Sequence, residues 1–250
     1  MWFAAGSVIA GSFKVFPLKL ELGQKTKTTL FKITNTGDTE VTVQLETAKW
    51  FQNEKGEDQY EDTSDIVYFP KIVKVEAGQQ RIIRIGFRGK PSGPLEKTYR
   101  IFAQELPEKG EKNSALKFSL RFSVPIFVRI PDTRPKATFS NAELINGQLS
   151  VMVNNAGTEH FVVKSVNVNG LRFDGQQTFT AKSGGWYVLP EVTKPFSVKM
   201  PENECRKSEH LKFKVETTAG AYENIIPVNA GDCVMIGDSN NATNSLSFTD

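Results

Sequence analysis

Short runs of alternating apolar and polar residues follow one another along almost the whole chain, while helical periodicity is almost absent. Turn-forming residues separate the runs, and Val, Ile, Phe and Thr dominate their apolar positions. The first half predicts strands at Phe13–Leu22, Thr26–Thr34, Val41–Leu45, Ile66–Val75, Gln80–Phe87, Thr98–Leu106 and Leu116–Val128. This succession of short strands predicts an all-β fold of the sandwich type.

Breaks in the alternation predict where strands bend or end. The apolar positions change parity between Leu45 and Ala48, which suggests a bulge or a strand that changes sheets. Residues 52–64 are polar and predict a loop. Pro70 interrupts the run 66–75 and predicts a sheet edge, because proline cannot donate to a ladder.

Two domains are expected. The first spans residues 13–130, and a proline-containing linker, Ile-Pro-Asp-Thr-Arg-Pro, leads into a second β-rich domain at 131–236. Within the second domain, Asn146-Gly147 and Asn169-Gly170 each predict a hairpin turn. The polar residues 237–250 predict a disordered tail.

A weak internal repeat supports two similar domains. Ile33-Thr-Asn35-Thr-Gly37 leads into an apolar strand, and Val153-Asn-Asn155-Ala-Gly157 does the same. Only one turn is shared, so a chance match is the alternative interpretation.

Composition excludes several classes of function. The 250 residues carry a net charge of +3, too small a bias to indicate binding of nucleic acid or of an anionic membrane. No apolar stretch is long enough to insert in a membrane. Residues 1–12 are apolar and rich in small side chains. They suit either the remnant of a signal peptide, cut after Ala10, or a disordered or strand-forming terminus.

The chain has two cysteines, Cys205 and Cys233. They are expected to pair in an exported protein and to stay reduced in the cytosol. Their spacing suits no metal motif, because no second pair and no nearby histidine cluster exists.

Nothing in the sequence indicates catalysis, a cofactor or a metal. Neither His160 nor His210 belongs to a metal-binding or catalytic motif, and His160 is predicted to be an exposed loop residue. The acidic pairs Glu57-Asp58 and Glu61-Asp62 fall in the polar loop and are predicted to be solvated. We therefore expect a protein that is not an enzyme.

The run that begins at Leu116 has the clearest alternation. Leu116, Phe118, Leu120, Phe122 and Val124 share one face, and Lys117, Ser119, Arg121 and Ser123 share the other. The apolar face fits either a closing strand that fills its own core or an edge strand that offers the same side chains to a partner. Pro125 favours an edge.

Six segments, in this order, resemble the periplasmic chaperones of bacterial chaperone–usher pilus assembly. They are Val15–Leu22, Leu30–Gly37, Trp50, Pro70–Arg84, Tyr99–Pro107 and Leu120–Val128. The resemblance implies two immunoglobulin-like sandwiches set at an angle with a cleft between them. It implies a periplasmic protein that binds a pilus subunit and delivers it to an outer-membrane usher.

In this family the closing strand completes the subunit's incomplete sandwich, which is called donor-strand complementation. Carried over by register, Leu116, Phe118, Leu120 and Phe122 would fill the subunit's groove. The sequence leaves open whether the uncomplexed protein dimerises by capping its own edge strand.

The family also holds the subunit's terminal carboxylate between an arginine and a lysine. Lys19 matches the arginine position, and the lysine position falls on Pro125, so half of the anchor is missing. The sequence around Pro125 resembles the archaic, or alternative, branch of the family, and Arg100 is the candidate replacement. The alternative for both Lys19 and Arg100 is a snorkelled surface charge.

Two other classes of function remain as alternatives: a cell-surface adhesin or structural pilus subunit, and a carbohydrate-active enzyme on a β-scaffold. The first predicts a single incomplete sandwich with an alternating N-terminal extension, which this sequence lacks. The second receives no support from the placement of the carboxylates.

Overall fold

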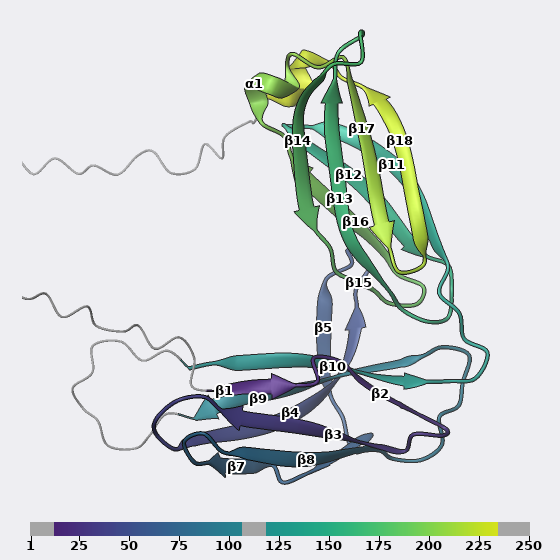
Figure 1. Cartoon of the computed structure of the whole chain (residues 1–250). Helices are drawn as coiled ribbons and strands as arrows, with labels where there is room; N and C mark the ends of the chain where they lie inside the picture. The colour runs from purple at the N-terminus through teal and green to yellow at the C-terminus, as the bar shows by residue number, and fades with distance from the viewer. Residues whose placement is uncertain (1–12, 107–118, 235–250) are drawn as a thin grey trace, which may run out of the picture. The chain divides into compact units, whose positions relative to one another are not determined.

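The computed structural model describes residues 13–106 and 119–234, which form strands almost throughout (Figure 1). The strands make four sheets, two in each of two compact units. The first unit comprises Met1–Pro135 with Gly157–His160, and the second comprises Lys136–Ala156 and Phe161–Asp250. The prediction of an all-β protein of two sandwiches is confirmed, and the expected angle between them stays a prediction.

The first unit packs two sheets around one core. Its strands are β1 (Phe13–Phe16), β2 (Leu20–Gly23), β3 (Thr28–Asn35), β4 (Val41–Gln52), β5 (Asp58–Asp62), β6 (Ile66–Phe69), β7 (Ile72–Val75), β8 (Gln80–Phe87), β9 (Lys97–Leu106) and β10 (Arg121–Arg129). One sheet has the order β1-β3-β8-β6, and the other has the order β2-β10-β9-β4-β5, with β7 also paired to β4. Between them, Phe31, Ile83 and Ile101 are fully buried.

Two runs are each divided between the sheets at a proline. The run 13–22, expected as one strand, is two: β1 pairs with β3 in one sheet, and β2, after Pro17, pairs with β10 in the other. Similarly, Pro70 separates β6, which pairs with β8, from β7, which pairs with β4. A proline cannot donate to a ladder, so it suits the point where the chain changes sheets.

The parity change in β4 is not a bulge, because β4 keeps one continuous register with β9. Leu45 lies in the core between the sheets, whereas Ala48 and Trp50 lie on the opposite face. There Arg100 and Phe127 pack against the indole ring of Trp50. The sequence pattern therefore records a second buried face of the sheet rather than an irregular backbone.

The polar loop predicted at 52–64 contains a strand, β5, which pairs with the second half of β4. Tyr60 of β5 contacts the ring of Phe102 edge-on, with centroids 5.4 Å apart. Of the two acidic pairs predicted to be solvated, Glu57, Glu61 and Asp62 are exposed, whereas Asp58 is half-buried and accepts a hydrogen bond from Gln52 at 2.9 Å. Backbone pairing and one aromatic contact hold a strand that has little apolar pattern to predict it.

The second unit is also a sandwich. Its strands are β11 (Ala137–Ile145), β12 (Gln148–Asn155), β13 (Phe161–Leu171), β14 (Gln177–Gly184), β15 (Tyr187–Val188), β16 (Thr193–Lys199), β17 (His210–Thr217) and β18 (Gly220–Pro227). They form sheets of order β11-β12-β16 and β14-β13-β17-β18, with β15 paired to β13. No helix in the described ranges is long and apolar enough to cross a membrane.

A disulfide joins two short helical segments of the second unit. Cys205 ends helix α1 (Glu202–Cys205), and Cys233 ends the 3-10 helix η1 (Ala230–Cys233). The two cysteines are bonded to each other and fully buried, so the predicted pairing is confirmed.

Of the two predicted Asn-Gly hairpins, one is confirmed and one is wrong. Asn146 and Gly147 have φ of 53° and 69° and connect β11 to β12, as a two-residue hairpin turn requires. Gly170 instead lies inside β13. A Cβ there would come within 2.3 Å of the Phe179 ring, so this glycine makes room for a neighbouring side chain.

The repeated Asn-x-Gly segment has the same structural role in both units. Asn35 ends β3 and Asn155 ends β12, and both are buried. The Nδ2 of Asn35 donates to the carbonyl of Val75 at 2.8 Å, and that of Asn155 donates to the carbonyl of Val188 at 3.0 Å. Each amide therefore ties the end of one strand to another strand of its own sandwich, which favours a genuine repeat over chance.

Candidate functional site

β10 has an open edge along half of its length. It pairs with β9 from Arg121 to Val128, but with β2 only from Ile126 to Arg129. Within the described ranges, the stretch 121–125 therefore pairs with a strand on one side alone. Such an edge can pair with a strand from another chain.

The backbone at this edge points outward at alternate residues. The N–H of Glu105 donates to the carbonyl of Leu120 at 2.9 Å, so Leu120 points toward β9. Successive residues of a strand point their backbone groups to opposite sides, so Arg121, Ser123 and Pro125 point away from β9. The N–H that Pro125 lacks is therefore not needed for the β9 ladder, which fits a proline at an edge.

The core-facing row of β10 becomes less buried toward this open end. Val124, Ile126 and Val128 of the row are buried. Leu120 and Phe122 are only partly buried, although both pack against the same core. The row thus leads from a closed core to side chains that the described part of the first unit does not fully cover.

The four side chains predicted to fill a partner's groove differ in where the structure places them. Leu116 and Phe118 lie outside the described residues. Leu120 stands at the open end of the row, whereas the ring of Phe122 packs edge-on against Phe13, with centroids 5.1 Å apart. Phe122 therefore already has a place in the core of its own unit.

Arg100 lies on β9 directly across from Pro125, on the sheet face away from the core. Only 2 % of the residue is exposed. Its guanidinium carbon is 3.7 Å from the centre of the Trp50 ring, and one of its nitrogens is 3.5 Å from the carbonyl oxygen of Ser123. The alternative of a snorkelled surface charge is wrong for Arg100, because this cation is buried beside the open half of β10.

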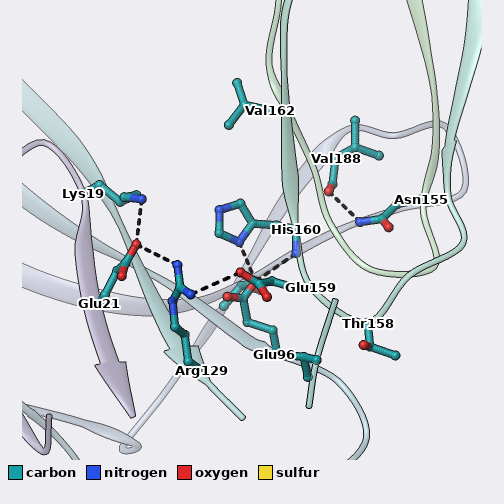
Figure 2. Close-up of polar contacts among 12 residues, drawn as sticks. Lys19, Glu21, Glu96, Arg129, Asn155, Thr158, Glu159, His160, Val162 and Val188 are labelled. Carbon is teal, nitrogen blue, oxygen red and sulfur yellow. Dashed lines mark hydrogen bonds and ion pairs between the residues drawn. The ribbon is translucent and has the colours of Figure 1, made fainter. Parts of the chain in front are cut away.

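Lys19 is exposed, in the bend that precedes β2. Its Nζ is 2.6 Å from an oxygen of Glu21, which Arg129 also contacts at 3.2 Å (Figure 2). Burial works to raise the pKa of Glu21, but Lys19 and Arg129 lower it on balance. Lys19 is thus a surface charge held by an ion pair.

A buried histidine lies on the same sheet face. The ring of His160 stacks on Phe127, with centroids 3.6 Å apart and planes within 8°. Its Nδ1 lies 2.5 Å from Oε2 of Glu96, and its backbone N–H donates to the same oxygen at 3.1 Å (Figure 2). The prediction that His160 is an exposed loop residue is wrong, because Phe127 and Glu96 enclose it.

An ion-pair chain continues from this histidine region. Arg129 approaches an oxygen of Glu159 at 3.6 Å as well as that of Glu21 (Figure 2). Burial works to lower the pKa of Arg129, but Glu21 and Glu159 raise it on balance. All of these residues belong to the first unit, which includes Gly157–His160.

Glu96, Glu159 and His160 bring possible metal ligands within 4.8 Å of one another. The imidazole is already bonded to Glu96, and the Arg129 guanidinium lies against Glu159. A cation there would have to compete with the imidazole for Glu96 and would lie beside the Arg129 guanidinium. The arrangement therefore suits an internal ion-pair network better than a metal centre.

Sequence reasoning missed this network. Glu96 and His160 are 64 residues apart, and neither belongs to a motif or to an apolar row. The one usable signal was the change of apolar parity before Trp50, which indicated that the outer face of β4 is also buried.

A shallow cavity of about 610 Å³ lies beside the start of β10. Its lining includes Tyr60, Phe102 and Arg121, whose guanidinium carbon lies 4.3 Å from the centre of the Phe102 ring. Next to the open edge, some side chains therefore line a cavity, whereas others pack in the core.

Comparisons with known proteins agree with this geometry. Residues 12–134 match the family described as pili and flagellar-assembly chaperone, PapD N-terminal domain. No curated protein matches the chain in sequence.

Several solved structures share the fold over most of the chain. A chain of the CsuC–CsuE chaperone–tip adhesion subunit complex, from archaic Csu pili of Acinetobacter baumannii, is 20 % identical with a TM-score of 0.60. The match covers 86 % of this chain and 97 % of that one. A chain from the Salmonella enterica complex of SafA pilin and SafB chaperone is 14 % identical, with a TM-score of 0.56 and coverage of 88 % and 99 %. The CupB2 chaperone of Pseudomonas aeruginosa is 17 % identical, with a TM-score of 0.54 and coverage of 86 % and 100 %. The first unit is thus a PapD-type N-terminal domain, and the chain belongs to the pilus-assembly chaperones.

Proposed function

We propose that this chaperone captures a pilus subunit by donor-strand complementation along the open half of β10. The observation that carries the proposal is the edge at 121–125, which pairs with β9 alone in the described chain. An incoming strand would bond to the outward backbone groups there. Leu116, Phe118 and Leu120 would enter the subunit's apolar groove, with Phe122 contributing less because it packs on Phe13.

The register around Pro125 supports an anchor for the subunit's terminal carboxylate. Arg100 pairs with Pro125 across β9. On the other side, the pairing of β2 with β10 begins at Leu20 and Ile126, the residues that follow Lys19 and Pro125. The two cations therefore flank the point where the open edge ends, and a strand paired along that edge would bring its terminus there.

The wider role follows from the family. We expect the protein to work in the periplasm, to hand its subunit to an outer-membrane usher, and to need no cofactor or catalytic group. The disulfide supports an oxidising compartment. The match to a chain from archaic pili supports, at the level of fold, the archaic branch. Two sandwiches with a core each count against the alternative of a structural pilus subunit or adhesin.

Co-expression with the subunit tests the donor strand. Burying a leucine or phenylalanine contributes roughly 1.5–3 kcal/mol, so Phe118→Ser combined with Leu120→Ser should abolish co-purification of the subunit. The matched control is Phe173→Ser, which changes an 83 % exposed ring of the second unit and should leave capture intact. If the double variant is folded and still co-purifies the subunit at the wild-type ratio, the assignment of the donor strand is wrong.

A further inference from the structure

The outer face of the β1-β3-β8-β6 sheet exposes an unusual number of large apolar side chains. Its inner face fills the core, as the buried Phe31, Ile33 and Ile85 show. Five large apolar residues of the outer face are between 46 % and 79 % exposed: Phe16, Leu30, Val67, Phe69 and Ile82. Contiguous apolar surface of this kind marks interaction sites on soluble proteins.

Strand register arranges four of these side chains, all but Val67, in two rows. Phe16 pairs with Lys32, which pairs with Ile82. One step along the sheet, Leu30 pairs with Arg84, which pairs with Phe69. Each row therefore has a cation between two apolar side chains.

The charge on this face has one sign. Besides Lys32 and Arg84, the face carries Lys14, and none of the described strand positions on it is acidic. The outer face of β17 and β18 in the second unit is a contrast. There Lys214 pairs with Glu216 at 3.1 Å and with Glu223 at 3.6 Å, so its charges neutralise one another.

From this arrangement we infer that the outer face of β1, β3, β8 and β6 is a docking surface for a protein partner that presents apolar side chains together with carboxylates. Apolar side chains of the partner would cover the ends of the two rows. Carboxylates would meet Lys32 and Arg84 at their centres, because a cation enclosed by an apolar contact needs a paired counter-charge.

The same charges disfavour two other occupants. A second copy related by a two-fold axis would set this basic face against itself. A lipid bilayer would have to take up Lys32 and Arg84 with the side chains that flank them, whereas membrane-binding faces keep cations at the rim of the inserted surface. The face also belongs to the sheet that lacks β10, so its occupation does not require the subunit-binding edge.

Three eight-residue peptides, matched to the length of β3, test the inference on the full chain. One alternates Glu with Phe and Leu, and the controls carry Lys or Ser in place of Glu. Methyl NMR of Leu30, Val67 and Ile82 should show shifts with the acidic peptide and none with the basic one. The methyl groups of Ile145 and Ile225, which are exposed on the second unit, should not respond.

Charge reversal sharpens the test. Lys32→Glu with Arg84→Glu should weaken the acidic peptide at least about tenfold, without changing the folding midpoint or subunit capture. The matched control is Lys55→Glu with Lys90→Glu, which makes the same change of net charge at exposed loop positions of the first unit and should leave binding unchanged.

Four results would overturn the inference. One is the absence of methyl shifts with the acidic peptide, and another is equal binding of the acidic and basic peptides. If the protein co-sediments with phosphatidylglycerol vesicles and Phe69→Ser abolishes this binding, the face is a lipid-binding surface. Self-association that Phe69→Ser abolishes in sedimentation equilibrium would make it an interface between copies.

Discussion

In the first unit Glu96, Arg100 and His160 are buried, whereas no acidic or basic side chain is buried in the described part of the second unit. The second unit pairs its charges at the surface, as between Lys214 and Glu216. Burying charge is costly unless partners compensate for it. The two sandwiches, which share the repeated Asn-x-Gly segment, thus differ in whether charged side chains are buried.

The unit that buries charged side chains is the one proposed to bind the subunit. Among the buried groups of the first unit, Arg100 lies opposite Pro125, where the open edge of β10 ends, and His160 stacks on Phe127, farther along the same strand. The second unit closes its core with a disulfide instead. Each variant predicted to change capture or stability alters one of the two units.

Removing the anchor cations should have the largest effect on subunit capture. A charge-assisted hydrogen bond contributes roughly 1.5–3 kcal/mol, so Lys19→Ala should weaken subunit capture about tenfold to hundredfold. Its folding midpoint should change little, because Lys19 is exposed and screening limits its ion pair with Glu21 to roughly 0.2–1 kcal/mol. Arg100→Ala should weaken capture at least as much. Titration of purified subunit, with urea unfolding in parallel, measures both effects.

A second variant is needed at Arg100, because Arg100→Ala also removes the packing of the guanidinium on Trp50 and so affects folding as well as capture. Arg100→Lys keeps the charge but not the planar fork, so it should recover folding more than capture. Lys74→Ala, which removes an exposed cation of the first unit, is the control. Normal capture by both Lys19→Ala and Arg100→Ala would remove the anchor from this protein.

Breaking the disulfide should affect stability rather than subunit capture, and only the stability of the second unit. Cys205 and Cys233 are 28 residues apart, and closing such a loop stabilises by about 3–4 kcal/mol on the chain-entropy model. Cys205→Ala with Cys233→Ala should speed hydrogen exchange in β13 and β17 and leave β3 and β8 unchanged. Denatured, unreduced wild-type protein should show no titratable thiol.

Subunit capture by this double variant is the informative readout. Below the unfolding temperature of its second unit, the variant should still capture a subunit, because the proposed edge belongs to the first unit. Equal loss of protection in both units would show that the two sandwiches do not unfold separately.

The sequence predicted the sandwiches because the alternation of β3, β8 and β12 records burial directly. It missed β5 because pairing with β4 and one ring contact, between Tyr60 and Phe102, hold that strand. It placed Gly170 in a turn because Asn-Gly usually forms one. The structure needs glycine there to clear Phe179, a contact that only tertiary packing creates.

The candidate site was predictable only where it follows strand register. Pro125 and the row that leads to Leu120 were predictable from the alternation. Arg100 was predicted only as a cation on the neighbouring strand, and its register opposite Pro125 comes from the structure. His160 was not, because its burial depends on Phe127 and Glu96, which are distant in sequence. Residues brought together by topology alone carry no local signal.

The smallest expected effect is a pH dependence at the surface end of the ion-pair chain. Lys19 and Arg129 lower the pKa of Glu21 below its ordinary value of 4.5. The stabilisation from ionised Glu21 is therefore present above about pH 4.5 and is lost as the pH falls through the lower folded-state value. Because the group is partly exposed, screening limits the gain to roughly 0.2–1 kcal/mol. Glu21→Gln should thus lower the unfolding free energy slightly at neutral pH and match the wild type in acid, as urea titrations at both pH values would measure. A difference that grows toward low pH would contradict the sign of this pKa shift, and Glu40→Gln, which breaks only the exposed pair with Lys74, is the matched control.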